Sequence, residues 1–275
     1  MSEPLHFDTH FVAKPSDHSI SQMAPMAKRH WKSGKARYLT GAEPARAERR
    51  AREAIQQLIG EARLSIVPLP YHLFVTSVVI DYIRPSGKNH VIAFSPRLLE
   101  GLGCHVTPLS YEPVGRDLLE PLITPRTALI SVPWACPTSG RLFPIDEIGA
   151  LCLERGLLLH VEGSGAIGKM AIDVEGSSVD FLTFEAAPMH GPKGIGAIAA
   201  RRPLTIDEGE VNRPALIAFG TAAEEARFAL DHLCLETARL RSLCYVVGRP
   251  LYADEMRLPT VAVIECDGID PDLMQ

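Results

Sequence analysis

Three residues able to exchange protons stand at the ends of two apolar runs in the middle of the chain. His160 and Glu162 close one run, and Glu185 directly follows the next one. Open α/β sheets bring the carboxyl ends of their parallel strands to one edge, where such folds place their binding sites. An imidazole and two carboxylates at that edge predict a cluster for general acid–base chemistry. The alternative is a structural role, because no nucleophile or metal-binding pattern accompanies them.

Two lysines lie close to these residues in the sequence. Lys193 belongs to a Gly-Pro-Lys-Gly turn, and Lys169 belongs to a Gly-Lys turn. A lysine amine can bond covalently to the carbonyl group of a cofactor, which makes Lys193 a candidate for such a bond. The alternative is that Lys193 is an ordinary loop cation. For Lys169 we expect a structural role.

The composition narrows the classes of partner and site. The chain has 275 residues, a net charge of −5 and a pI near 6.1, which argues against nucleic acid or an anionic membrane as the main partner. There is no signal-peptide pattern and no apolar run of the roughly 20 residues that span a bilayer, so we expect a cytoplasmic protein. The six cysteines form no CxxC pair and the ten histidines no HExxH motif. His6 and His10 have ligand-like spacing but lack a third ligand, and we therefore expect no metal site.

Strand-like and helix-like patterns alternate along the chain after a first segment rich in structure breakers. We predict an irregular arm over residues 1–40, a large domain over 41–212, and linking helices with part of a small domain over 213–275. The alternation indicates an α/β fold with a mainly parallel, mixed sheet and helices on both faces. Strands are predicted at 64–69, 90–94, 105–109, 128–133, 157–161, 181–184, 195–200 and 260–266, and helices at 42–60, 144–155 and within 213–247.

Several segments resemble one known family. Residues 128–173 contain the run LLLHVEGSGAIGKM, and residues 179–202 read VDFLTFEAAPMHGPKGIGAIAARR. Both resemble the class V aminotransferase and cysteine desulfurase family, whose members use pyridoxal 5′-phosphate (PLP). Residues 213–247 are similar to the family's long linking helix, and Phe7-Asp8 with the 42–60 helix are similar more weakly. The resemblance implies the large domain of PLP fold type I, followed here by a truncated small domain.

The residue expected to bond the cofactor differs from the family pattern. A Ser-x-His-Lys segment lies before Gly-Pro-Lys-Gly in the family, and its lysine forms the Schiff base with PLP. The matching positions in this chain run from Glu185 to Pro188. Since proline has no primary amine, the resemblance implies that Pro188 makes no Schiff base.

The residues implied to contact the cofactor's ring also differ. The family's Asp beside the pyridine nitrogen matches Glu162, in the run His160-Val161-Glu162-Gly163, and the longer side chain displaces the carboxylate by about one bond length. The family's Gln matches Gly165, which offers no side chain. His160 belongs to the same vestigial cofactor motif.

The residues implied to contact the phosphate and the substrate differ as well. The family's Gly-Ala-Thr at a helix N-terminus matches Tyr71-His72-Leu73, so that His72 stands in the phosphate cradle. Glu185 replaces a serine that binds the phosphate, and its charge opposes that anion. The family's Asn-Asn-Glu-x-Gly loop matches Cys136–Gly140. We expect Tyr71, Trp31 and Trp134 to line the emptied pocket or a dimer seam.

These differences together predict a catalytically inactive, cysteine desulfurase-like protein without PLP. We expect it to form a homodimer or to bind a protein partner, such as a sulfur-transfer component, and to bind neither nucleic acid nor membrane. The alternative is a divergent PLP-dependent desulfurase, lyase or aminotransferase that uses Lys193 or holds PLP without a covalent bond. A third possibility is an acid–base enzyme without PLP.

Overall fold

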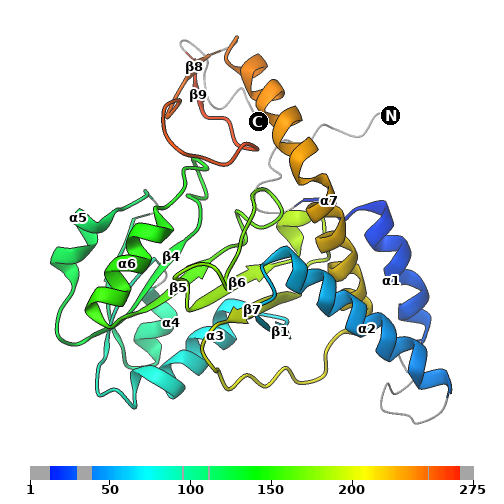
Figure 1. The fold of residues 1–275 in the computed structure, drawn as a ribbon, viewed down its shortest axis with the longest axis horizontal. Coiled ribbons are helices and arrows are strands. Elements are labelled where there is room, and N and C mark those ends of the chain that lie inside the picture. Colours follow the sequence, from blue (N-terminus) through cyan, green and yellow to red (C-terminus); the bar gives the residue numbers. More distant parts are fainter. Residues whose placement is uncertain (1–12, 30–38, 95, 111, 247, 267–275) are drawn as a thin grey trace.

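A seven-stranded sheet forms the centre of the protein (Figure 1). The computed structural model describes residues 13–29, 39–94, 96–110, 112–246 and 248–266. The strands run in the spatial order β1-β7-β6-β5-β4-β2-β3. They are β1 (Arg63–Val67), β2 (His90–Ala93), β3 (His105–Pro108), β4 (Thr127–Pro133), β5 (Leu158–Glu162), β6 (Phe181–Glu185) and β7 (Gly196–Ala200).

The sheet is mixed but mainly parallel, as the sequence predicted. Strands β3, β2, β4, β5 and β6 run parallel to one another, whereas β7 lies antiparallel to both β6 and β1. Strand β4 is buried along its whole length. Complete burial is typical of parallel strands covered on both faces, and it explains why the sequence reads there as a continuous apolar run.

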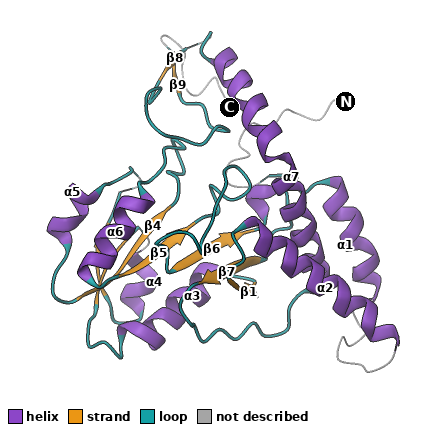
Figure 2. Cartoon of the chain, viewed as in Figure 1, coloured by secondary structure: helices purple, strands orange, loops and turns teal. Residues whose placement is uncertain are grey.

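Helices cover both faces of the sheet (Figure 2). Side chains alternate between the two faces along each strand, so that Ile66 joins one apolar core and Val67 the other. The first core lies under α2 (Leu39–Leu58), α5 (Arg116–Leu119), α6 (Ile145–Arg155) and α7 (Arg213–Cys244). The second lies under α3 (Pro70–Val78), the π-helical turn η1 (Val79–Ile83) and α4 (Pro96–Gly101). The short turns η2 (Glu120–Leu122) and η3 (Ala187–Met189) complete the domain.

Helix α7 is a single long helix that packs against α2 near its N-terminal end and projects beyond the sheet at its C-terminal end (Figure 1). The side chain of Asn212 accepts a hydrogen bond from the backbone N–H of Ala215 and caps the helix start. Gly220 permits close packing, because a Cβ at this position would lie 2.4 Å from the Cα of Ala51 in α2. The hairpin of β8 (Arg249–Pro250) and β9 (Ile264–Glu265) lies near the projecting end.

The prediction of an irregular arm over residues 1–40 was wrong in its described part. Helix α1 (Asp17–Arg29) forms there and packs against α7, although Pro25 lies inside it. Ser16 caps the helix by accepting a hydrogen bond from the Ser19 N–H at 3.0 Å, and Ser16 also donates to Glu225 of α7. Packing against α7 therefore outweighs the backbone hydrogen bond that proline removes.

Two further predictions need correction. The last strand is much shorter than the predicted 260–266, with only Ile264–Glu265 paired to β8. Helix α4 was not predicted, and the start of α3 was implied only by the family resemblance at Tyr71-His72-Leu73. Residues 1–12, with His6, Phe7, Asp8 and His10, and residue 31 lie outside the described residues. The predicted division of the chain at residues 40 and 212 stays a prediction.

Candidate active site and cofactor pocket

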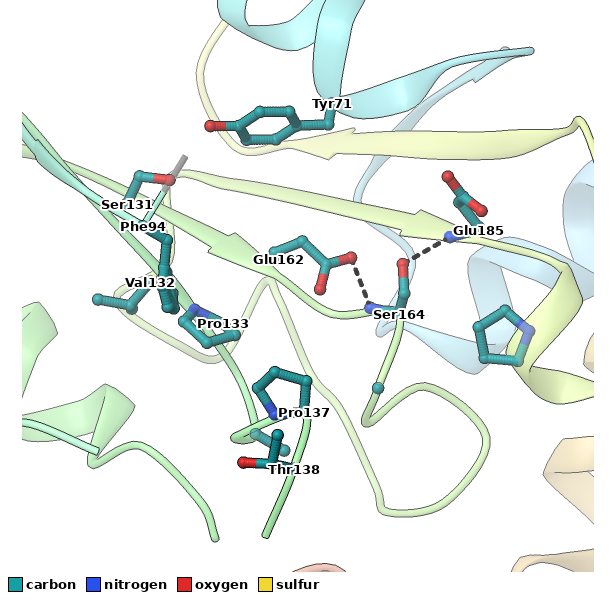
Figure 3. A pocket seen from close by; sticks show the side chains of 13 residues that line it. Tyr71, Phe94, Ser131, Val132, Pro133, Pro137, Thr138, Glu162, Ser164 and Glu185 are labelled. Atoms are coloured by element: carbon teal, nitrogen blue, oxygen red, sulfur yellow. Dashed lines mark hydrogen bonds between the residues drawn. The ribbon is translucent and has the colours of Figure 1, made fainter. Parts of the chain in front are cut away.

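A cavity of about 530 Å³ opens at the carboxyl ends of β4, β5 and β6 (Figure 3). This edge is where open α/β sheets place their ligands, and the volume is within the usual range for small-molecule sites. Five residues singled out from the sequence lie on its wall: Tyr71, Glu162, Gly165, Glu185 and Pro188. The other lining residues are Phe94, Ser131, Val132, Pro133, Ala135, Pro137, Thr138 and Ser164.

Strand β5 delivers Glu162 to the cavity between β4 and β6. Glu162 is in register with Pro133 on one side and Thr183 on the other. Its Oε1 atom accepts a hydrogen bond from the Ser164 N–H at 3.0 Å. Burial raises the pKa of Glu162 and the charge of Glu185 raises it further, while the bonds to Ser164 oppose the rise. The carboxyl group is therefore easier to protonate than an ordinary glutamate.

Glu185 is the last residue of β6, and Pro188 lies in the loop that connects β6 to β7. Glu185 is exposed at the mouth of the cavity, and its backbone N–H donates to the Ser164 hydroxyl at 3.0 Å. Pro188 is buried in η3 and lines the cavity. A backbone hydrogen bond from the Ala186 N–H to the Ile195 carbonyl closes the loop. Position 188 is thus held on the cavity wall by the hairpin itself.

Helix α3 meets the cavity with Tyr71, not with His72 as expected. The helix begins at Pro70, with Leu69 as its N-cap, one residue earlier than the predicted match implied. Because successive helical side chains point about 100° apart, Tyr71 faces the cavity while His72 points away and is exposed. His72 therefore lies outside the pocket.

His160 belongs to the core and not to the predicted acid–base cluster. It is fully buried, its Nδ1 lies 2.8 Å from the Ser131 hydroxyl, and its Nε2 lies 2.9 Å from the Thr183 hydroxyl. Its ring stacks on Phe74 with centroids 4.1 Å apart. Burial lowers the pKa of His160 to about 3, which keeps the imidazole neutral near pH 7. Of the three proposed members, only Glu162 and Glu185 face the cavity.

The lysines lie elsewhere. Lys193 is exposed in the β6–β7 loop and does not line the cavity. Lys169 is buried and lines a second cavity of about 430 Å³, which shares Pro188 with the first. Burial lowers the pKa of Lys169 to about 8. The sequence predicted Lys193 as the candidate for bonding a cofactor and a structural role for Lys169, whereas in the structure only Lys169 lines a cavity.

Sequence reasoning also missed some members of the site. Ser164 connects both carboxylate-bearing strand ends. Serine is a common turn residue, so its place directly after a strand could have indicated this role. Phe94 gave no signal, because its position depends on how β2 lies beside β4. Of the aromatic residues expected at the pocket, Tyr71 lines it and Trp134 is buried in the core.

Two kinds of site are absent from the described part of the chain. It holds no group of three or more His, Cys, Asp or Glu side chains that could bind a metal ion. Among the helices of those same residues, none combines the length and the apolar character that crossing a membrane requires.

Known proteins share both the sequence pattern and the fold. Residues 97–210 match the family model described as Aminotransferase class-V. A cysteine desulfurase of Nostoc sp. is 28% identical over 264 residues, covering 86% of this chain and 66% of the relative. The solved structure of a NifS-like protein has a TM-score of 0.86 at 20% identity and covers 98% of this chain and 84% of that one. The apo cysteine desulfurase of Thermococcus onnurineus NA1 gives 0.79 at 14% identity, covering 99% and 81%.

The sheet, its covering helices and these structural likenesses define the fold of PLP-dependent transferases of fold type I. The sequence is similar to those of class V aminotransferases and cysteine desulfurases, a family whose members normally use PLP. It spans just under two-thirds of the length of the Nostoc relative.

Proposed function

We propose that this chain keeps the fold of its family but does not bond PLP through a lysine, and that it acts by binding a second copy of itself or another protein of sulfur transfer. One observation carries the proposal: Pro188 occupies the cavity wall, and none of the 13 described lining residues is a lysine. Without an amine on its described wall, this cavity offers a carbonyl cofactor no lining group with which to form an imine.

The residues present do not fit the phosphate of PLP. Helix N-termini hold phosphates through free backbone N–H groups and close backbone approach. Here the first helical residue is Pro70, which has no N–H, and the bulky ring of Tyr71 follows it on the cavity side. Glu185 adds a carboxylate to the same cavity, which repels an anion.

The residues present do not fit the ring of PLP either. A pyridinium is held protonated by a carboxylate of low pKa. The raised pKa of Glu162 weakens it in that role. Gly165, at the position implied to bond the cofactor's phenolic oxygen, has no side chain to offer.

One observation favours a second candidate function, a divergent enzyme with a relocated lysine. Lys169 lies in the adjoining cavity, and its lowered pKa leaves part of the amine unprotonated near neutral pH. Lys193, the residue considered from the sequence, is exposed and outside both cavities. An enzyme of this kind would therefore use Lys169.

Absorbance and mass spectrometry distinguish the two candidates. The protein is incubated with PLP, scanned for a band at about 410–430 nm, reduced with borohydride and digested. The proposal expects no band, no pyridoxyl group on Lys169 and no sulfide release from cysteine. A band that is lost in Lys169→Arg but kept in the control Lys193→Arg would establish the second candidate and refute the first.

Light scattering tests the binding half of the proposal. A homodimer has twice the chain mass of 30.0 kDa. A monomer at all concentrations, with no association with a sulfur-transfer protein, would refute it.

A further inference from the structure

The cavity at the strand ends has the composition of a site for a small molecule with an apolar body. Phe94, Val132, Pro133 and Pro137 are among the apolar residues of its wall. Small-molecule sites typically combine such a wall with a few converging polar groups that select and orient the ligand. This inference rests on the proposed function, which excludes PLP, and the polar groups of the wall then determine which class of ligand the cavity favours.

The charged side chains of the wall are both acidic. Glu162 and Glu185 come from the ends of the adjacent strands β5 and β6, and the described lining residues include no Lys, Arg or His. Ser164 links them, by donating its N–H to Glu162 and by accepting the Glu185 N–H. The two carboxylates thus come from neighbouring strand ends that Ser164 joins, with no cation on the described wall to balance them.

The raised pKa of Glu162 indicates which sign of ligand charge the cavity favours. Burial and the charge of Glu185 both raise its pKa, so the ionised form of Glu162 is disfavoured beside the Glu185 carboxylate. A cation placed between them reverses this effect, whereas an anion strengthens it. The ring of Tyr71 borders the same open space in Figure 3, and an aromatic face also attracts cations.

We propose that the cavity binds a small organic ammonium compound that carries an apolar group and no carboxylate. The ammonium group donates hydrogen bonds to Glu162 and Glu185, and the apolar group lies against Val132, Pro133 and Pro137. An α-amino acid carries its own carboxylate next to the ammonium group, and the two glutamates repel it. The pocket thus selects amines over amino acids.

Isothermal titration calorimetry with three matched probes tests the proposal on the full chain without added PLP. Isopentylamine is the expected ligand, while isopentanol lacks its charge and leucine adds a carboxylate. We expect isopentylamine to bind with a dissociation constant of about 1 mM or below, and each other probe at least about tenfold more weakly. Equal binding of the amine and the alcohol, or no saturable binding of the amine, would overturn the proposal.

Variants locate the binding in the cavity. Glu162→Gln and Glu185→Gln should each weaken isopentylamine binding by about tenfold, because each removes a charge-assisted hydrogen bond. Glu175→Gln is the control, since Glu175 is exposed and lies outside the cavity wall. Glu185 is exposed, so its variant stays informative if Glu162→Gln folds poorly. Unchanged affinity in Glu185→Gln would refute the assigned site.

Failure of this inference and failure of the proposed function have different signatures. A lysine-bound cofactor appears as absorbance and as a modified lysine, whatever the amines do. Weak or unselective amine binding by a protein that also forms no lysine adduct would refute the amine site alone.

Discussion

Acidification should destabilise the protein through His160. In the folded chain its ring is enclosed between Phe74 and the hydroxyls of Ser131 and Thr183, and its pKa falls to about 3. In the unfolded chain the same ring has a pKa of about 6.5. At pH values between these two pKa values, His160 is protonated in the unfolded state but not in the folded state. His160 therefore costs no stability above pH 6.5, and it reduces stability progressively as the pH falls toward 3.

The size of the effect follows from the two pKa values. Each pH unit between them is worth about 1.36 kcal/mol, so the full loss approaches about 5 kcal/mol near pH 3. At pH 5 the loss is about 2 kcal/mol. A domain is stable by only about 5–15 kcal/mol, so a loss of this size is readily measured.

Urea unfolding at pH 7, 6 and 5 tests this reasoning in the wild type and in His160→Gln. Glutamine can bond the same hydroxyls but does not titrate. The variant should be less stable at pH 7, and its deficit should shrink by about 2 kcal/mol at pH 5. The control His72→Gln alters an exposed ring and leaves the His160 effect in place. A deficit that is constant from pH 7 to pH 5 would show that His160 is not held neutral by burial.

Substitutions of Gly220 and Glu208 test two other contacts of the fold. Gly220→Ala places a methyl group against the backbone of α2 and should lower the free energy of unfolding by about 1–3 kcal/mol. The control Gly101→Ala has open space around it and should change the free energy of unfolding by less than about 1 kcal/mol. Equal urea midpoints for the two variants would contradict the close packing. Glu208 accepts hydrogen bonds from Arg52 at 2.6 Å and from the Ile66 N–H of edge strand β1 at 3.1 Å. Glu208→Ala should therefore cost about 1–3 kcal/mol, with faster amide exchange at Ile66, and unchanged exchange would refute its role at this edge.

The strands were predictable because burial on both faces leaves a direct mark on the sequence. The run predicted at 128–133 is β4, and the helix predicted at 144–155 is α6, with Gly156 at a φ of 62° as its C-cap. Helix α3 was not predictable in the same way. It follows Pro68 and Pro70 and is rich in aromatic and β-branched residues, so that packing on the sheet decides its form.

The sequence predicted those residues of the cavity that lie at the ends of parallel strands. Glu162 and Glu185 end adjacent parallel strands, and this alone brings them to one edge of the sheet. The role of His160 was not predictable, since it lies only two residues before Glu162 and shares its face of the sheet, yet Phe74 of α3 covers it. Whether Tyr71 or His72 faces the pocket depends on the residue at which α3 begins.

The loop that carries Pro188 is held by bonds that do not involve that residue. The N–H groups of Ala186, Met189 and Gly191 donate to the carbonyls of Ile195 and Ala186, and the Ala13 N–H donates to Ala187. Any side chain compatible with a buried turn can therefore stand at position 188 without loosening the hairpin. A proline and a lysine at position 188 would therefore leave the same four backbone hydrogen bonds in place, so the hairpin does not itself determine whether this residue carries a reactive amine.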